Sequence, residues 1–133
     1  TAVLAMAAAR LWPGRTNLAS DIDAGAVDVA RANLRANGIE GQVSCVEAAG
    51  FDHPDLAAAT PYDLIFANIL KQPLIDLAPE MAAALAPGGH VILSGILTRQ
   101  AEEVIDAYAA QGVPLLRQEV IGDWVTLTLR KPE

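Results

Sequence analysis

Apolar and polar positions follow two different patterns along this 133-residue chain. Short apolar runs such as 62–68 carry consecutive aliphatic or aromatic residues, which is typical of strands buried on both faces of a sheet. The stretch 24–36 instead places Val27, Ala30 and Leu34 on one face of a helix. In chain order the pattern predicts helix 1–11, strand 17–21, helix 24–36, strand 42–46, a loop over 47–60 with one helical turn, strand 62–68, helix 73–85, strand 91–97, helix 98–110 and strands 115–120 and 124–129.

Turn and cap residues mark the ends of these predicted elements. Asp23 and Thr98 are the predicted N-caps of helices 24–36 and 98–110, and Gly38 follows the first of these helices as its C-terminal cap. Pro79 either kinks or restarts the helix that opens at Pro73. The alanine-rich opening, residues 1–11, is expected to be a buried, closely packed helix.

The order of elements predicts an α/β fold. Alternating strands and helices indicate a mostly parallel sheet with helices on both faces. Residues 121–123 include a Gly-Asp turn between the last two strands, which must therefore pair antiparallel. A terminal antiparallel hairpin is not the usual ending of a dinucleotide-binding dehydrogenase fold. It resembles the ending of the class I methyltransferase fold, which is Rossmann-like.

Composition narrows the possible folds and functions of the protein further. Apolar residues make up 53% of the chain and aromatic residues 5%, so one aliphatic core in a single domain is expected. A net charge of −7 argues against direct nucleic-acid binding, which needs a basic face. A single cysteine, Cys45, excludes an internal disulfide and fits a reducing cytoplasm. The opening apolar stretch is too short to span a membrane, and His53, His90 and Cys45 lack metal-ligand spacing.

The first candidate for chemistry is Asp21, where strand 17–21 ends on an acid, an aliphatic residue and a second acid. A carboxylate there lies at the carboxyl edge of a parallel sheet, where open α/β sheets bind ligands. It can accept two hydrogen bonds from a ribose diol, each contributing roughly 1.5–3 kcal/mol. We therefore expect Asp21 to bind the ribose of an adenosine-containing cofactor and Ile22 to lie along the adenine. The alternative is a solvated loop acid, followed by an ordinary N-cap at Asp23.

Several segments agree with one family. They are SDID at 20–23, ARAN at 30–33, FANIL at 66–70, LAPGGHV at 85–91, LSGIL at 93–97 with QAEE at 100–103, and GDWVTL at 122–127. Together they cover nearly the whole chain. The combination resembles the family of ribosomal protein L11 methyltransferases, PrmA.

The resemblance implies a function and a set of roles. The family transfers methyl groups from S-adenosyl-L-methionine to lysine side chains and the N-terminal amine of ribosomal protein L11. By matching motif, Asp21 binds the cofactor ribose and Ile22 packs on the adenine. Val46 and Glu47 occupy the loop that reads the adenine edge. Asn68 lies beside the methionine end of the cofactor and the incoming amine.

The family's glycine-rich loop is expected immediately before Thr1. Thr1 to Ala5 looks like the start of the helix that follows this loop, which places Thr1 beside the cofactor. The central strand leading into the loop and the family's substrate-holding amino-terminal domain also lie outside the sequence. Residues 1–133 are therefore expected to form an N-terminally incomplete methyltransferase domain, with cofactor affinity sharply reduced in the absence of the loop.

Asn68 is the predicted catalytic residue. Methyl transfer is an in-line displacement on an activated donor, so the protein mainly aligns the reactants. The amine must be neutral, and desolvation lowers the lysine pKa from about 10.4. The Asn68 amide oxygen can accept a hydrogen bond from the amine and aim its lone pair, but it is not a strong base. Alternatively, Asn68 only caps the next turn, and Lys71 and Gln72 either rim the substrate opening or lie in a solvated loop.

Two other functions remain open at the level of sequence. An acid at the end of the second strand also binds the ribose of NAD in oxidoreductases, although the terminal hairpin and the ANIL motif argue against this. A non-catalytic binding module that kept the fold is the second alternative, since the glycine-rich loop is missing. Trp124 is expected to lie in the core rather than form a binding platform.

Overall fold

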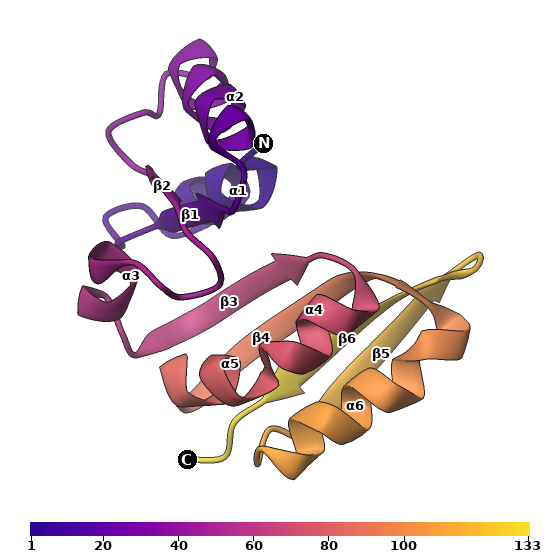
Figure 1. Ribbon diagram of the computed structural model, residues 1–133. Coiled ribbons are helices and arrows are strands. Elements are labelled where there is room, and N and C mark those ends of the chain that lie inside the picture. The colour runs from indigo at the N-terminus through magenta and orange to yellow at the C-terminus, as the bar shows by residue number, and fades with distance from the viewer. The chain divides into compact units, whose positions relative to one another are not determined.

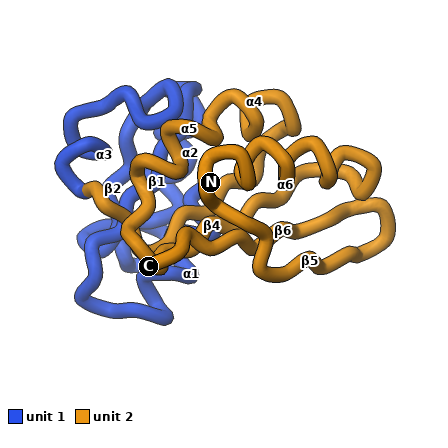
Figure 2. The backbone as a smooth tube through the Cα atoms, turned by 90° about the horizontal axis from the view of Figure 1, so that it is seen from below, with its two compact units in different colours: residues 1–59 blue, residues 60–133 orange.

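The computed structural model describes residues 1–133, and the chain forms two compact units (Figure 2). The first unit is Thr1–Ala59 and the second is Thr60–Glu133. Each unit has its own sheet, and each is described here by itself.

The first unit contains three helices and a pair of parallel strands (Figure 1). Its elements are α1 (Val3–Leu11), β1 (Leu18–Asp21), α2 (Ala24–Ala36), β2 (Ser44–Glu47) and α3 (Pro54–Ala58). Leu18 lies opposite Ser44 and Asp21 opposite Glu47, so both strands end at the same edge. The apolar face of α2 packs in a core cluster that includes Ala9 of α1 and Cys45 of β2.

Helix α2 has the bounds predicted from its periodicity. Asp23 Oδ1 accepts a hydrogen bond from the Gly25 amide at 3.2 Å, which confirms the predicted N-cap. Gly38 follows the helix with a φ of +68°, as expected for a C-terminal cap. The predicted apolar residues Val27, Ala30 and Leu34 are all buried.

The second unit is a four-stranded mixed sheet. Its elements are β3 (Tyr62–Asn68), α4 (Lys71–Asp76), α5 (Ala78–Ala84), β4 (Leu85–Leu97), the 3₁₀ turn η1 (Thr98–Gln100), α6 (Ala101–Ala110), β5 (Leu115–Ile121) and β6 (Trp124–Arg130). The spatial order is β3-β4-β6-β5. β3 and β4 are parallel, whereas β6 is antiparallel to β4 and β5. The α/β class and the terminal antiparallel hairpin are therefore confirmed, with the strands divided between two sheets.

Helices α4, α5 and α6 lie along one face of this sheet (Figure 1). The core includes fully buried residues from both layers: Leu74, Val91, Leu93, Val104, Tyr108, Leu127 and Leu129. Tyr108 carries the one polar group among them, and its Oη donates to the Leu74 carbonyl at 3.0 Å. This hydrogen bond joins α6 to α4 and satisfies a hydroxyl that burial would otherwise penalise.

Several predicted bounds need correction. Thr98 begins the turn η1 instead of capping a helix; at this end the Gln100 side chain accepts a hydrogen bond from the Leu97 amide at 2.9 Å. β4 begins at Leu85 and not at the predicted residue 91, because Leu85 already pairs with Tyr62 of β3. Pro79 lies in the first turn of a new helix, α5, which confirms the restart and not the kink.

Three burial predictions are wrong. Of β3 only Ala67 is buried, because this strand pairs with β4 alone and is an edge of its sheet. Trp124 is 57% exposed, because it starts the last strand at the tip of the hairpin. Helix α1 is largely exposed and buries only Ala8 and Ala9.

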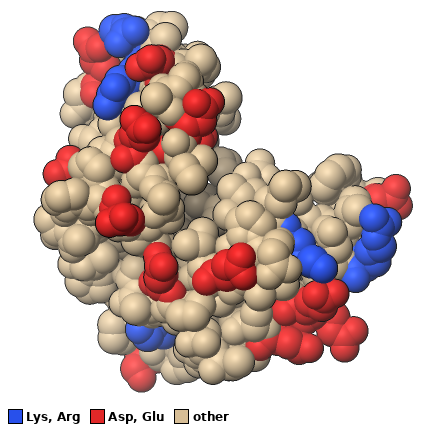
Figure 3. All heavy atoms as spheres, viewed as in Figure 1, with Lys and Arg blue, Asp and Glu red and all other residues tan.

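The surface is acidic in total, and its charges are dispersed. On the face viewed in Figure 3, Asp and Glu side chains occur over much of the surface, and Lys and Arg form small separate groups. Across residues 1–133, none of the helices has the length and apolarity that crossing a membrane requires.

Candidate functional site

Two acids hold the turn between β1 and α2. Asp21 Oδ1 accepts a hydrogen bond from the Asp23 amide at 3.1 Å, and Asp23 in turn caps α2. The Asp21 carbonyl accepts from the Ala48 amide at 2.9 Å, which joins the ends of β1 and β2. The Asp21 side chain is exposed at the carboxyl edge of the strand pair, and neighbouring Ile22 is 72% exposed. The strand edge therefore presents a hydrogen-bond acceptor, the Asp21 carboxylate, next to the apolar surface of Ile22.

A small hollow in the first unit brings Thr1 and Asp21 together. Its lining also includes residues of β1, α2 and Cys45, and its volume is about 30 Å³. The Thr1 carbonyl accepts a hydrogen bond from the Asn33 side chain at 3.0 Å, which holds the chain start against α2. The hollow has room for about one water molecule. A nucleoside bound to Asp21 would therefore lie mostly outside it.

Val46 lies in strand β2, as the predicted strand 42–46 has it. The strand continues through Glu47, which therefore does not lie in the predicted loop. The Val46 side chain is buried in a cluster with Ala48 and Leu56, so only its backbone could meet a ligand. Glu47 is exposed and lies opposite Asp21 in the strand register. Of this predicted pair, Glu47 is the side chain available to a ligand at the strand ends.

Asn68 ends strand β3 in the second unit, and its side chain is exposed. It lies opposite Ser94 of β4. The alternative role as a helix cap is not found, because Leu70 is the N-cap residue of α4 and no side chain caps that helix. Asp21 and Asn68 thus belong to different units, and each stands at the carboxyl end of a parallel strand.

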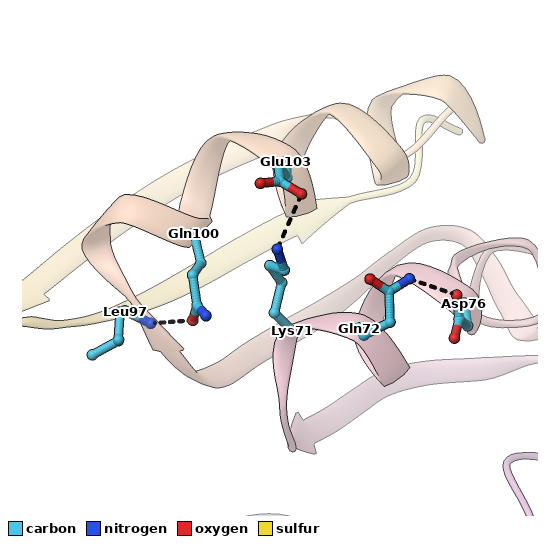
Figure 4. Close-up of polar contacts among 6 residues, drawn as sticks. All are labelled: Lys71, Gln72, Asp76, Leu97, Gln100 and Glu103. Atoms are coloured by element: carbon cyan, nitrogen blue, oxygen red, sulfur yellow. Dashed lines mark hydrogen bonds and ion pairs between the residues drawn. The ribbon is translucent and has the colours of Figure 1, made fainter.

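The residues after Asn68 are held by polar contacts (Figure 4). Lys71 Nζ lies 3.2 Å from Glu103 Oε2, which ties the start of α4 to α6. Gln72 Nε2 donates to Asp76 Oδ1 at 2.9 Å along the same helix. Lys71 and Gln72 are therefore helical and not part of a solvated loop. The partner Glu103 was not predicted, since it is 32 residues away and no local pattern indicates such a pair.

The other nucleophilic or titratable candidates have structural roles. Cys45 is buried, and this burial raises the pKa of its thiol, although the charge of Arg31 opposes the shift. His53 Nδ1 accepts a hydrogen bond from the Asp55 amide at 3.0 Å and caps α3. Within residues 1–133 no three His, Cys, Asp or Glu side chains are grouped as metal ligands would be.

Comparison with known proteins gives consistent matches. The family model described as ribosomal protein L11 methyltransferase (PrmA) matches residues 1–132. A protein of Bradyrhizobium diazoefficiens named ribosomal protein L11 methyltransferase is 52% identical over 98% of the chain, and one of the same name from Chelativorans sp. is 50% identical over 98%. The chain spans only 44% and 45% of the lengths of these two relatives.

Solved structures give the same relationship. The ribosomal protein L11 methylase of Lactobacillus delbrueckii subsp. bulgaricus superimposes with a TM-score of 0.88 at 30% identity. The match covers 98% of this chain and 65% of that one. A methyltransferase of Pyrococcus furiosus, 20% identical with a TM-score of 0.80 over 100% of this chain and 71% of its own, shares the fold.

Proposed function

We propose that this chain, which belongs to the ribosomal protein L11 methyltransferase (PrmA) family, is the greater part of an S-adenosylmethionine-dependent methyltransferase domain. The observation that carries the proposal is the pair of polar side chains at strand ends, Asp21 as the last residue of β1 and Asn68 as the last residue of β3. Carboxyl ends of parallel strands are where open α/β sheets bind nucleotide-like ligands.

In this proposal the first unit holds the adenosine. Asp21 accepts hydrogen bonds from the ribose hydroxyls, and its orientation is supported by the Asp23 amide. Ile22 offers exposed apolar surface to the adenine, and Glu47 stands beside Asp21 to meet the adenine edge. Thr1 would lie next to the cofactor at the small hollow. S-adenosylmethionine supplies an activated methyl group when it is bound.

Asn68 acts on the methyl acceptor. Its exposed amide oxygen accepts a hydrogen bond from a neutral amine and orients the nitrogen lone pair. An amide cannot remove a proton at neutral pH, so the amine must arrive deprotonated. Exclusion of water around the amine lowers its pKa and favours the neutral form.

The proposed acceptors are lysine side chains and the N-terminal amine of ribosomal protein L11, in the cytoplasm. The names of the relatives support this substrate. The domain is proposed to be completed by an upstream segment that carries a strand and a glycine-rich loop. β1 and β3 each have a strand partner on one side only, and such an edge can accept a further strand.

Neither alternative function is favoured by a specific observation. The two relatives described above are named methyltransferases and not oxidoreductases. A non-catalytic module would retain the fold but would not need an exposed amide at the end of β3.

The test is a methyl-transfer assay with the full-length protein, labelled S-adenosylmethionine and ribosomal protein L11. Asn68→Ala should lower kcat roughly 10- to 100-fold, because the amide orients the acceptor. Asn37→Ala, at the exposed end of α2, is the matched control and should behave as wild type. No turnover by the wild-type protein would instead favour the non-catalytic module.

A further inference from the structure

Strand β4 contains an irregularity at its carboxyl end. Its pairing with β6 changes register between Leu93 and Ile96. Gly95 lies within this bulge with a φ of +84°, a conformation that residues with a Cβ atom rarely adopt. Bulges of this kind bend a strand and redirect neighbouring side chains.

The end of β3 packs directly against Gly95. A Cβ atom at position 95 would lie 2.7 Å from Asn68 Oδ1 and 2.8 Å from the Ile69 carbonyl oxygen. Both distances are shorter than real Cβ contacts, so a side chain would displace the Asn68 amide or the Ile69 peptide. The bare Cα of Gly95 is therefore part of the surface on which Asn68 rests.

Contacts on either side limit how far this region could adjust (Figure 4). Downstream of Asn68, Lys71 is paired with Glu103 of α6, and its side chain is only 27% exposed. Downstream of Gly95, the Leu97 amide donates to the Gln100 side chain. Both backbone segments are thus held near the point where they meet.

We propose that Gly95 is a positioning residue for Asn68, because the absence of a side chain lets the Asn68 amide lie against β4 in the orientation that receives the acceptor amine. The inference rests on the function proposed above for Asn68. Gly95 itself contacts neither cofactor nor substrate in this account. Gly95 affects methyl transfer only because it determines the position of the Asn68 amide.

The experiment compares four variants of the full-length protein: Gly95→Ala, Asn68→Ala, the double variant and Gly112→Ala. Gly112 also has a left-handed φ, +78°, but an added Cβ there would meet nothing within 4 Å, so it controls for backbone strain alone. Gly95→Ala should lower kcat roughly 10- to 100-fold, since small misplacements of an orienting group cost that much. Affinity for S-adenosylhomocysteine should change less than twofold, and Gly112→Ala should retain wild-type kcat.

The double variant separates positioning from a general structural defect. In the Asn68→Ala background, Gly95→Ala should lower kcat by less than a further twofold, because the amide is already gone. An equal loss in both backgrounds, or wild-type kcat in Gly95→Ala, would overturn the inference. Wild-type kcat in Asn68→Ala would instead refute the proposed function of Asn68.

A stability measurement covers the case in which Gly95→Ala does not fold. Asn68→Ala removes the Oδ1 atom nearest to the new Cβ, so the double variant should melt at a higher temperature than Gly95→Ala. No recovery of the melting temperature would show that the Ile69 peptide, and not the Asn68 amide, is what an added Cβ displaces, and would overturn the inference.

Discussion

Asp21 and Asp23 illustrate how two identical side chains take different roles two positions apart. Asp23 is committed to the helix, since its Oδ1 caps α2. Asp21 Oδ1 accepts a hydrogen bond from the Asp23 amide, and the Asp21 carboxylate is exposed at the strand end. The sequence predicted both placements because strand ends and N-caps are local signals. The ribose contact of Asp21 stays a prediction.

Ala2 is the only non-glycine residue of the chain with a positive φ, at +64°. A left-handed backbone costs a residue with a Cβ about 1–2 kcal/mol. Ala2→Gly should therefore raise the free energy of unfolding by about 1 kcal/mol, measured by urea denaturation. Ala7→Gly, at an exposed position within α1, is the matched control and should lower it by about 1 kcal/mol. Equal losses in both variants would contradict the strained conformation at Ala2.

At the level of elements, sequence patterns correctly predicted the bounds that depend on local chemistry. The bounds of α2 and β3 were predicted in full, because caps and hydrophobic spacing define them. Burial was predicted less well, because it depends on which strands become neighbours: β3 is an edge strand, and Trp124 is exposed at a hairpin tip. The Gly95 bulge was also missed, since a glycine in an apolar run carries no sign of what packs on it.

Tyr108 gives a prediction for the contact between α6 and α4. Tyr108→Phe removes the hydrogen bond to the buried Leu74 carbonyl and should lower the free energy of unfolding at pH 7 by about 1–2 kcal/mol. Denaturant titration followed by circular dichroism measures this change. An unchanged value would mean that the hydroxyl contributes no net stability.

The same residue predicts an alkaline pH dependence. Burial raises the pKa of Tyr108 well above its ordinary value of 10.0. Above pH 10 the unfolded chain loses this proton while the folded chain keeps it, so stability falls by about 1.4 kcal/mol per pH unit. Tyr108→Phe lacks this loss, and the stability difference between wild type and variant should therefore narrow as pH rises above 10. A constant difference would contradict the raised pKa.

At the level of the whole molecule, the two candidate regions lie in separate units, and the chain spans less than half the length of its curated relatives. The hollow beside Asp21 has room for only about one water molecule, so Asp21 and Ile22 alone offer a cofactor few contacts. Much of the cofactor affinity is therefore expected to come from the proposed upstream glycine-rich loop.

This assignment predicts a difference in affinity between the 133-residue chain and the full-length protein. Isothermal titration calorimetry with S-adenosylhomocysteine should give a Kd at least tenfold higher for the shorter chain, since each lost hydrogen bond of about 1.4 kcal/mol is a factor of ten. Circular dichroism of the shorter chain controls for folding. Equal affinities would place the whole cofactor site within residues 1–133.

Asp21 is proposed to bind the ribose of a methyl donor. The most direct test of this proposal is calorimetry of the full-length protein and Asp21→Ala with S-adenosylhomocysteine and with NAD, with Asp106→Ala, an exposed acid of α6, as the control. We expect the full-length protein to bind S-adenosylhomocysteine but not NAD. The affinity for S-adenosylhomocysteine should be at least tenfold weaker in Asp21→Ala and unchanged in Asp106→Ala. Selective binding of NAD, or undiminished affinity in Asp21→Ala, would contradict the proposal.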